Sequence, residues 1–116
     1  MGEFKIKRIY DTPSDDDGYR VLVDRLWPRG VSRKTAQLDE WNKEIAPSPD
    51  LRKWFDHKEE HFQEFALKYR LELADRKEQL NELRQQAKNQ SVSLLYAAKS
   101  PEINHTVILK EVLSEG

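Results

Sequence analysis

Four side chains in the segment 21–30 are suited to binding or to chemistry, and they belong to Asp24, Arg25, Trp27 and Arg29. The two guanidinium groups are planar sets of donors that match a phosphate or a carboxylate. The indole offers a flat apolar surface for a ring, and the carboxylate can move a proton. All four follow the apolar run 21–23, which has the character of a buried strand. Because ligands of open α/β sheets bind beyond the carboxyl ends of the strands, we expect a ligand site here.

A second apolar run, Val92–Tyr96, is predicted to end at the same edge of the sheet. Tyr96 would then line the pocket, and the final helix would bring Asn104 and His105 close to its N-terminus. We interpret Asp24 and His105 as candidate catalytic residues. The candidate ligand-binding residues are Arg25, Trp27, Arg29, Tyr96 and Asn104. Such a set predicts a pocket for a small anion that carries an aromatic group.

Each of these residues also has a purely structural explanation. Asp24 could pair with other charges at the strand ends, and Trp27 could fix its loop by packing on the sheet. His105 lies on an apolar helical face, where a histidine that is hydrogen-bonded within the core is common. The two arginines, Arg25 and Arg29, have the least obvious structural purpose. The sequence leaves these alternatives open.

Composition limits the classes of function. The 116 residues contain 20 Lys and Arg against 21 Asp and Glu, for a net charge of −1, which gives no overall field for nucleic acid or an anionic membrane. No cysteine is present, which excludes disulfides and thiolate chemistry and suits a reducing cytoplasm. There is no signal-like start and no apolar run of the ~18 to 20 residues that span a bilayer. We therefore expect a soluble cytoplasmic protein with no membrane contact.

The strands are predicted at Phe4–Tyr10, Tyr19–Leu26 and Val92–Tyr96. The intervening segment 11–18 reads as a solvated turn, and its adjacent aspartates lack the alternate spacing of a calcium loop. Ser32–Ala36 predicts a helical turn, whereas Leu38–Ile45 fits either a strand or a helix. The sheet should be short and at least partly parallel.

The helices are predicted from their caps. Ser48 and Pro49 begin one helix, and Asp56 with Glu59 resembles a capping box for the next. A single helix over 57–88 would be about 48 Å long at ~1.5 Å per residue, so we expect a break near 74–77 unless the helix protrudes to form a homodimer. Ser100 and Pro101 would begin the final helix. The whole chain, 1–116, is predicted to be one α/β sandwich domain whose sheet is packed by helices.

No cofactor or metal site is predicted. The chain has four glycines and no phosphate-binding glycine-rich loop. His57 and His61 lie one helical turn apart, but Lys58 occupies the position where the zinc-protease motif requires Glu. We interpret these histidines as surface residues.

Five segments of the chain resemble one known pattern, and they are Lys7-Arg8-Ile9-Tyr10-Asp11, Asp17 through Gly30, Ala46-Pro47-Ser48, Leu51 through Phe55, and Leu94 through Ala98. The pattern is that of the YeaO-like branch of the uncharacterised family called domain of unknown function 488. The resemblance runs from about residue 5 to about residue 113. It implies a small α/β domain and no established activity.

Longer members of the wider family carry a cysteine after the last strand and a Cys-His-Arg triplet at the next helix. The matching positions here are Tyr96-Ala97-Ala98 and Asn104-His105-Thr106, so a thiol mechanism does not apply. Three functions stay open: a hydrolase or transferase for a phosphorylated or nucleotide-like molecule, a non-catalytic module that binds a small anion, and a protein–protein interaction domain. We favour the enzyme slightly at this stage.

Overall fold

A four-stranded parallel sheet forms the centre of the described part of the molecule. The computed structural model describes residues 3–116, and its strands are β1 (Phe4–Arg8), β2 (Tyr19–Leu22), β3 (Glu40–Trp41) and β4 (Val92–Tyr96). Their order is β1-β4-β2-β3, and every pairing is parallel. The predicted small α/β fold with a parallel sheet is therefore confirmed.

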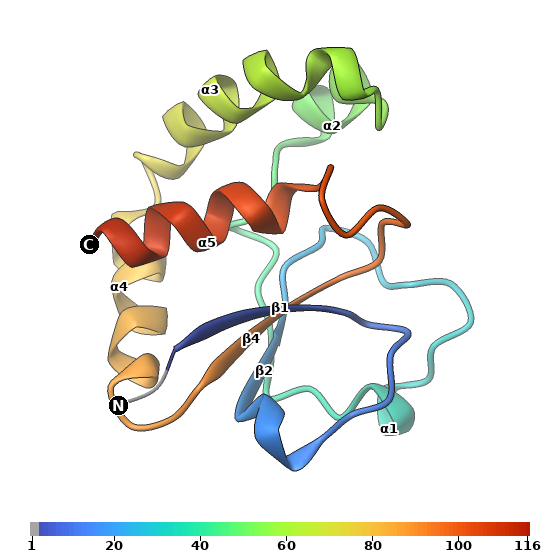
Figure 1. Cartoon of the computed structure of the whole chain (residues 1–116), viewed down its shortest axis with the longest axis vertical. Coiled ribbons are helices and arrows are strands. Elements are labelled where there is room, and N and C mark those ends of the chain that lie inside the picture. The colour runs from blue at the N-terminus through green and yellow to red at the C-terminus, as the bar shows by residue number, and fades with distance from the viewer. Residues whose placement is uncertain (1–2) are drawn as a thin grey trace.

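The described residues form five α-helices, of which the first four lie between strands and the last follows β4: α1 (Arg33–Ala36), α2 (Pro49–Phe55), α3 (Phe62–Leu73), α4 (Lys77–Ala87) and α5 (His105–Glu115). Short 3-10 helices form at Asp15–Asp17 and Glu59–His61. Figure 1 shows α5 running across the sheet, with α3 beyond it, and α5 contacts β1 and β4 as well as α3. No helix within residues 3–116 has the length and apolar character needed to cross a membrane.

The central strand β4 explains why this sheet is stable. All five of its residues are buried, and Leu94 lies in register between Ile6 of β1 and Val21 of β2. One face of the sheet packs against α2 to α5 in an apolar core that includes Val21, Leu94, Phe55, Phe65, Tyr69, Leu83 and Leu109. The apolar run 21–23 predicted a buried strand at the position of β2, and Val21, Leu22 and Val23 are each 0% exposed.

The opposite face of the sheet has a smaller apolar cluster. It contains Ile9, Leu22, Ala36 and Leu95, covered by the partly buried indoles of Trp27 and Trp41. The two rings meet edge to face with centroids 5.3 Å apart. Trp27 is therefore part of the packing on this face.

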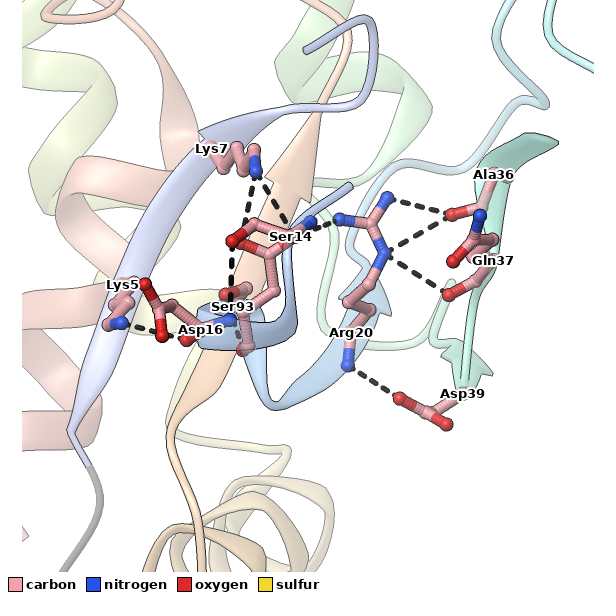
Figure 2. Close-up of polar contacts among 10 residues, drawn as sticks. Lys5, Lys7, Ser14, Asp16, Arg20, Ala36, Gln37, Asp39 and Ser93 are labelled. Carbon is pink, nitrogen blue, oxygen red and sulfur yellow. Dashed lines mark hydrogen bonds and ion pairs between the residues drawn. The ribbon is translucent and has the colours of Figure 1, made fainter. Parts of the chain in front are cut away.

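Charged side chains fill the same face toward the N-terminal ends of the strands. Arg20 donates to Asp17 (2.6 Å) and to the main-chain oxygens of Ala36 (2.7 Å) and Gln37 (3.1 Å). Lys7 pairs with the same carboxylate at 3.0 Å. Figure 2 shows the Arg20 guanidinium directed at the main-chain oxygens of Ala36 and Gln37, with Lys7 of β1 on the opposite side of the cluster. Within residues 3–116, every fully buried side-chain nitrogen and oxygen, including those of this cluster, has a hydrogen-bond partner.

This cluster corrects the prediction that 11–18 is a fully solvated turn. Asp17 is only 5% exposed because it closes a capping box with Ser14, whose main-chain N–H it accepts, and pairs with two cations. Asp15 and Asp16 are exposed, as expected. The spacing Ser14-x-x-Asp17 is the local signal that distinguishes the third aspartate from the other two.

Several predicted strands and helices differ from the structure in their bounds. Strand β1 ends at Arg8 rather than Tyr10. Strand β2 ends at Leu22 rather than Leu26, and Leu38–Ile45 contains only the two-residue strand β3. Asp56 does not cap the next helix: it ends α2 with a φ of +47° and donates its N–H to Arg52 O. Ser100 accepts from the N–H groups of Glu102 and Ile103 in a turn, and α5 begins later, at His105.

The predicted helix break is confirmed. Helix α3 ends at Leu73 and α4 begins at Lys77. The described chain measures 35 Å along its longest axis, so an unbroken helix of about 48 Å would have extended beyond it. The predicted cap of α2 at Ser48 and the predicted helical turn at Ser32–Ala36 are also confirmed, and in the structure the hydroxyls of Ser48 and Ser32 each accept an N–H from the first turn of the helix that follows.

Candidate functional site

An open cleft of about 600 Å³ lies at the C-terminal edge of the sheet. Three parts of the chain form it: the loop that follows β2, the segment that follows β4 together with the start of α5, and the C-terminal end of α2. Five residues that the sequence singled out line this cleft, namely Asp24, Trp27, Arg29, Asn104 and His105. The predicted convergence of these segments is therefore present in the structure.

Asp24 and His105 lie side by side in the cleft. Asp24 Oδ1 is 3.3 Å from His105 Nε2, and Asp24 Oδ2 accepts the N–H of Ala97 at 2.9 Å. The carboxylate therefore links the end of β2 to the segment after β4. Asp24 therefore pairs with other groups at the strand ends, as its structural explanation requires, and it also borders the cleft, as a functional residue would.

The protonation of His105 follows from its partner. Nε2 lies 2.6 Å from the carbonyl oxygen of Val23, and a carbonyl oxygen only accepts, so Nε2 carries a proton. Burial lowers the pKa of the imidazole below its usual value, while Asp24 and the Val23 carbonyl oppose this effect. The ring is therefore neutral near pH 7, with its proton on Nε2.

Asn104 positions the start of α5. Its Oδ1 accepts from Thr106 N at 2.9 Å and also contacts the Thr106 hydroxyl, while its Nδ2 donates to Ser100 O at 2.8 Å. Asn104 is thus the N-cap of α5, and its amide group is engaged by the protein on both sides. The positive end of the helix dipole consequently faces the cleft.

Four basic side chains line the walls of the cleft, and they belong to Arg29, Arg52, Lys53 and His57. All four residues are exposed. Within residues 3–116, the side chains of Arg29, Arg52 and Lys53 take part in no salt bridge. The cleft therefore has cationic donors that are available to a ligand.

The end of α2 gives this wall an uncommon backbone. Asp56 and His57 have φ angles of +47° and +55°, in the left-handed region that non-glycine residues adopt rarely. Conformations of this kind cost free energy and are enriched at functional sites. They turn the chain sharply after Phe55, so that His57 faces the cleft instead of continuing the helix.

Arg25 does not line the cleft. Its Nε donates to Pro47 O at 2.7 Å and its Nη2 to Ala46 O at 3.3 Å. These bonds tie the loop after β2 to the segment immediately before α2. Arg25 therefore joins the two elements that carry the basic side chains.

Tyr96 also lies outside the cleft. It is 2% exposed, and its burial raises the pKa of the phenol. Trp27 borders the cleft, but its indole N–H donates to Val31 O at 2.6 Å and the Arg33 guanidinium stacks 4.2 Å above its ring. The aromatic surface that the sequence offered to a ligand ring is largely occupied by the protein.

The sequence analysis missed Arg52, Lys53 and His57. The capped start of α2 was recognised, but Asp56 was assigned to the following helix, which concealed the turn that directs this end of α2 into the cleft. The available sequence signal was the shortness of this helix: Pro49 begins it and it has seven residues, so its last turn had to lie close to the same edge of the sheet as its start.

No group of three or more His, Asp or Glu residues within 3–116 is arranged to hold a metal ion. His57 and His61 do not form a pair. His61 stacks on Trp54 at 4.4 Å between centroids, and its Nδ1 lies 3.1 Å from Trp54 O.

Comparisons with known proteins identify the family of this chain. A family model described as the inactive DUF488-N3 subclade, DUF488-N3i, matches residues 3–116. The uncharacterised protein YeaO of Escherichia coli is 45% identical over 107 residues, covering 92% of this chain and 93% of YeaO. Uncharacterised proteins of Mycobacterium bovis and Mycobacterium tuberculosis are 37% identical over 110 residues, covering 95% of this chain and 92% of each relative. No solved structure matches the chain. The chain therefore belongs to the YeaO-like part of the DUF488 family.

Proposed function

We propose that this protein is a non-catalytic module that binds a small organic anion in the cleft beside Asp24. The observation that carries the proposal is the set of unpaired cations, Arg29, Arg52 and Lys53, on two walls of one cleft. Two guanidinium groups and an ammonium group suit the oxygens of a phosphate or a carboxylate. The N-terminus of α5 adds a favourable dipole at the same place.

The remaining surface of the cleft indicates an organic ligand rather than a bare inorganic ion. Leu26, Pro28 and Phe55 contribute apolar atoms to it. Leu26 is 66% exposed, which is a large exposure for a leucine and leaves its side chain available for contact. A ligand with a charged group and a short hydrocarbon or ring portion would use both parts of the lining.

Two further facts favour binding over catalysis. Within residues 3–116, the residues that line the cleft include no Ser, Thr, Tyr or Cys that could act as a nucleophile. The family model that matches the chain carries the description "inactive".

The test is a thermal-shift and calorimetric screen with phosphate esters, nucleotides and small carboxylates. A ligand at about 100 times its Kd should add about 2.7 kcal/mol of stability, visible as a Tm raised by several degrees. The variant Arg29→Gln/Arg52→Gln should lose this shift. The control Lys34→Gln/Lys110→Gln removes two positive charges from exposed positions outside the cleft and should keep it. An equal shift in both variants would contradict the proposal.

An enzyme is the second candidate, and the contact between Asp24 and His105 at 3.3 Å is the observation in its favour. A carboxylate beside a neutral imidazole is an arrangement that can transfer protons. If a ligand from the screen is converted by the wild-type protein, Asp24→Asn should abolish turnover while binding persists. Stable ligands recovered unchanged after long incubation would leave binding as the function.

A further inference from the structure

His105 provides a hydrogen-bond acceptor that the protein itself does not use. Its Nε2 donates to Val23 O, so in the neutral ring Nδ1 keeps its lone pair. Within residues 3–116, Nδ1 makes no hydrogen bond, although every fully buried side-chain nitrogen and oxygen there has a partner. Nδ1 must therefore retain some accessible surface, and the residue borders the cleft.

The rest of this imidazole is enclosed. His105 is 9% exposed, and Tyr69 meets it edge to face with centroids 6.1 Å apart. The Val23 carbonyl and Asp24 hold the opposite nitrogen. The ring therefore cannot turn freely, and the position of its lone pair is set before any ligand arrives.

A neutral imidazole nitrogen of this kind selects its partners. It accepts a hydrogen bond from a hydroxyl or an N–H group, and it repels an oxygen that carries only lone pairs. A fully ionised phosphate or carboxylate oxygen suits the cations Arg29, Arg52 and Lys53 but not His105 Nδ1. A ligand that satisfies both parts of the cleft needs an anionic group and a separate donor.

We infer that the cleft binds an anion that also carries a hydroxyl group, such as the phosphate ester of a polyol or sugar, with the hydroxyl donating to His105 Nδ1. This inference rests on the proposed function, because it assigns the anionic group of the same ligand to the basic walls. It adds the requirement for a donor, which charge alone does not impose.

Two ligands of equal charge and carbon number test the inference. Glycerol 3-phosphate has two hydroxyl groups, and n-propyl phosphate has none. By calorimetry, glycerol 3-phosphate should bind about two- to tenfold more tightly, which is the range expected of one neutral hydrogen bond. The variant His105→Phe keeps a ring but removes both nitrogens and should bring this ratio to one.

A second measurement uses the unaltered protein, in case His105→Phe does not fold. In the ¹⁵N spectrum of histidine-labelled protein, the resonance of His105 Nδ1 should move on adding glycerol 3-phosphate and stay in place with n-propyl phosphate. Equal affinities and a stationary resonance would overturn the inference while leaving the anion site intact. If neither ester bound, the proposed function and, with it, this inference would be overturned.

Discussion

The two ends of the sheet use the same kinds of residue in opposite ways. At the N-terminal end, Asp17, Arg20 and Lys7 are brought together, and each charge is paired within the protein. At the C-terminal end, Arg29, Arg52 and Lys53 stand around an open cleft without such pairs. Residue type alone therefore does not distinguish a cation that holds the fold together from a cation that is available to a ligand. The distinction lies in whether its donors already have partners.

Arg25 lies at the C-terminal end of the sheet, but its side chain is hydrogen-bonded within the protein, as that of Arg20 is. Both guanidinium groups donate to main-chain carbonyls of distant segments, Arg20 to Ala36 and Arg25 to Pro47. Arg25 and Arg29 are four residues apart and looked equivalent in the sequence. The structure gives the first a partner in the protein and leaves the second free.

The largest effect is expected from the N-terminal cluster. Replacing Arg20 by Met should cost about 3 to 5 kcal/mol of unfolding free energy, since it leaves the Asp17 carboxylate and the Ala36 carbonyl short of partners in a buried place. Urea denaturation measures the loss. Lys34→Met, at an exposed position, is the control, and a loss of similar size there would break the comparison.

Acid should reveal the same cluster. Burial by itself would raise the pKa of Asp17, but hydrogen bonds from Ser14, Lys7 and Arg20 outweigh burial and hold the pKa below its ordinary value of 3.8. A lowered folded-state pKa stabilises the protein above pH 3.8, and this stabilisation is lost as the pH falls through the folded-state value. Unfolding followed by circular dichroism should therefore lose stability below about pH 4, and Asp17→Asn should be less stable at pH 7 with a flatter acid limb. Parallel acid limbs in the two proteins would contradict this assignment.

Arg25 should give an intermediate effect. Arg25→Ala removes two charge-assisted bonds to partly buried carbonyls, which should cost about 1 to 3 kcal/mol in urea unfolding. Arg25→Lys retains the charge but not the forked donor, so it should recover only part of the loss. A loss below about 0.5 kcal/mol for Arg25→Ala would place this residue with the free cations instead.

The smallest effect is expected at the cleft. Arg29→Ala and Arg52→Ala should each change the unfolding free energy by under about 0.5 kcal/mol, because neither side chain has a partner to lose. The same variants should weaken binding of a phosphate ester clearly in calorimetry. A substantial loss of stability at either position would show that it is a structural clamp.

Much of the fold could be predicted because its signals are local. The apolar runs of β2 and β4, the helical turn at 32–36, the serine cap of α2 and the break after Leu73 each depend on neighbouring residues. The general place of the cleft followed from the rule for parallel sheets. The predicted edge brought Asp24, Arg29 and His105 together as expected.

The roles of individual cations could not be predicted, because their partners are far away in the chain. Arg25 bonds to Pro47 and Arg8 bonds to Ala98, and neither partner carries a side-chain signal, since the acceptors are main-chain carbonyls. The turn after α2 was missed for another reason: Asp56 adopts a left-handed conformation that short-range propensity assigns to glycine.

The position of β4 between β1 and β2 has a consequence for synthesis on the ribosome. Strands β1 and β2 do not pair with each other: β1 pairs only with Val92–Tyr96 in the described residues, and β2 lies between this strand and β3. The four-stranded sheet therefore cannot be completed while the nascent chain is shorter than this strand: until then β1 has no strand partner, and β2 can pair only with the two-residue strand β3. Contacts between such distant residues also slow folding. A chain interrupted before residue 92 would leave β1 without a strand partner and one edge of β2 unpaired, and it should be recognised by chaperones and proteases.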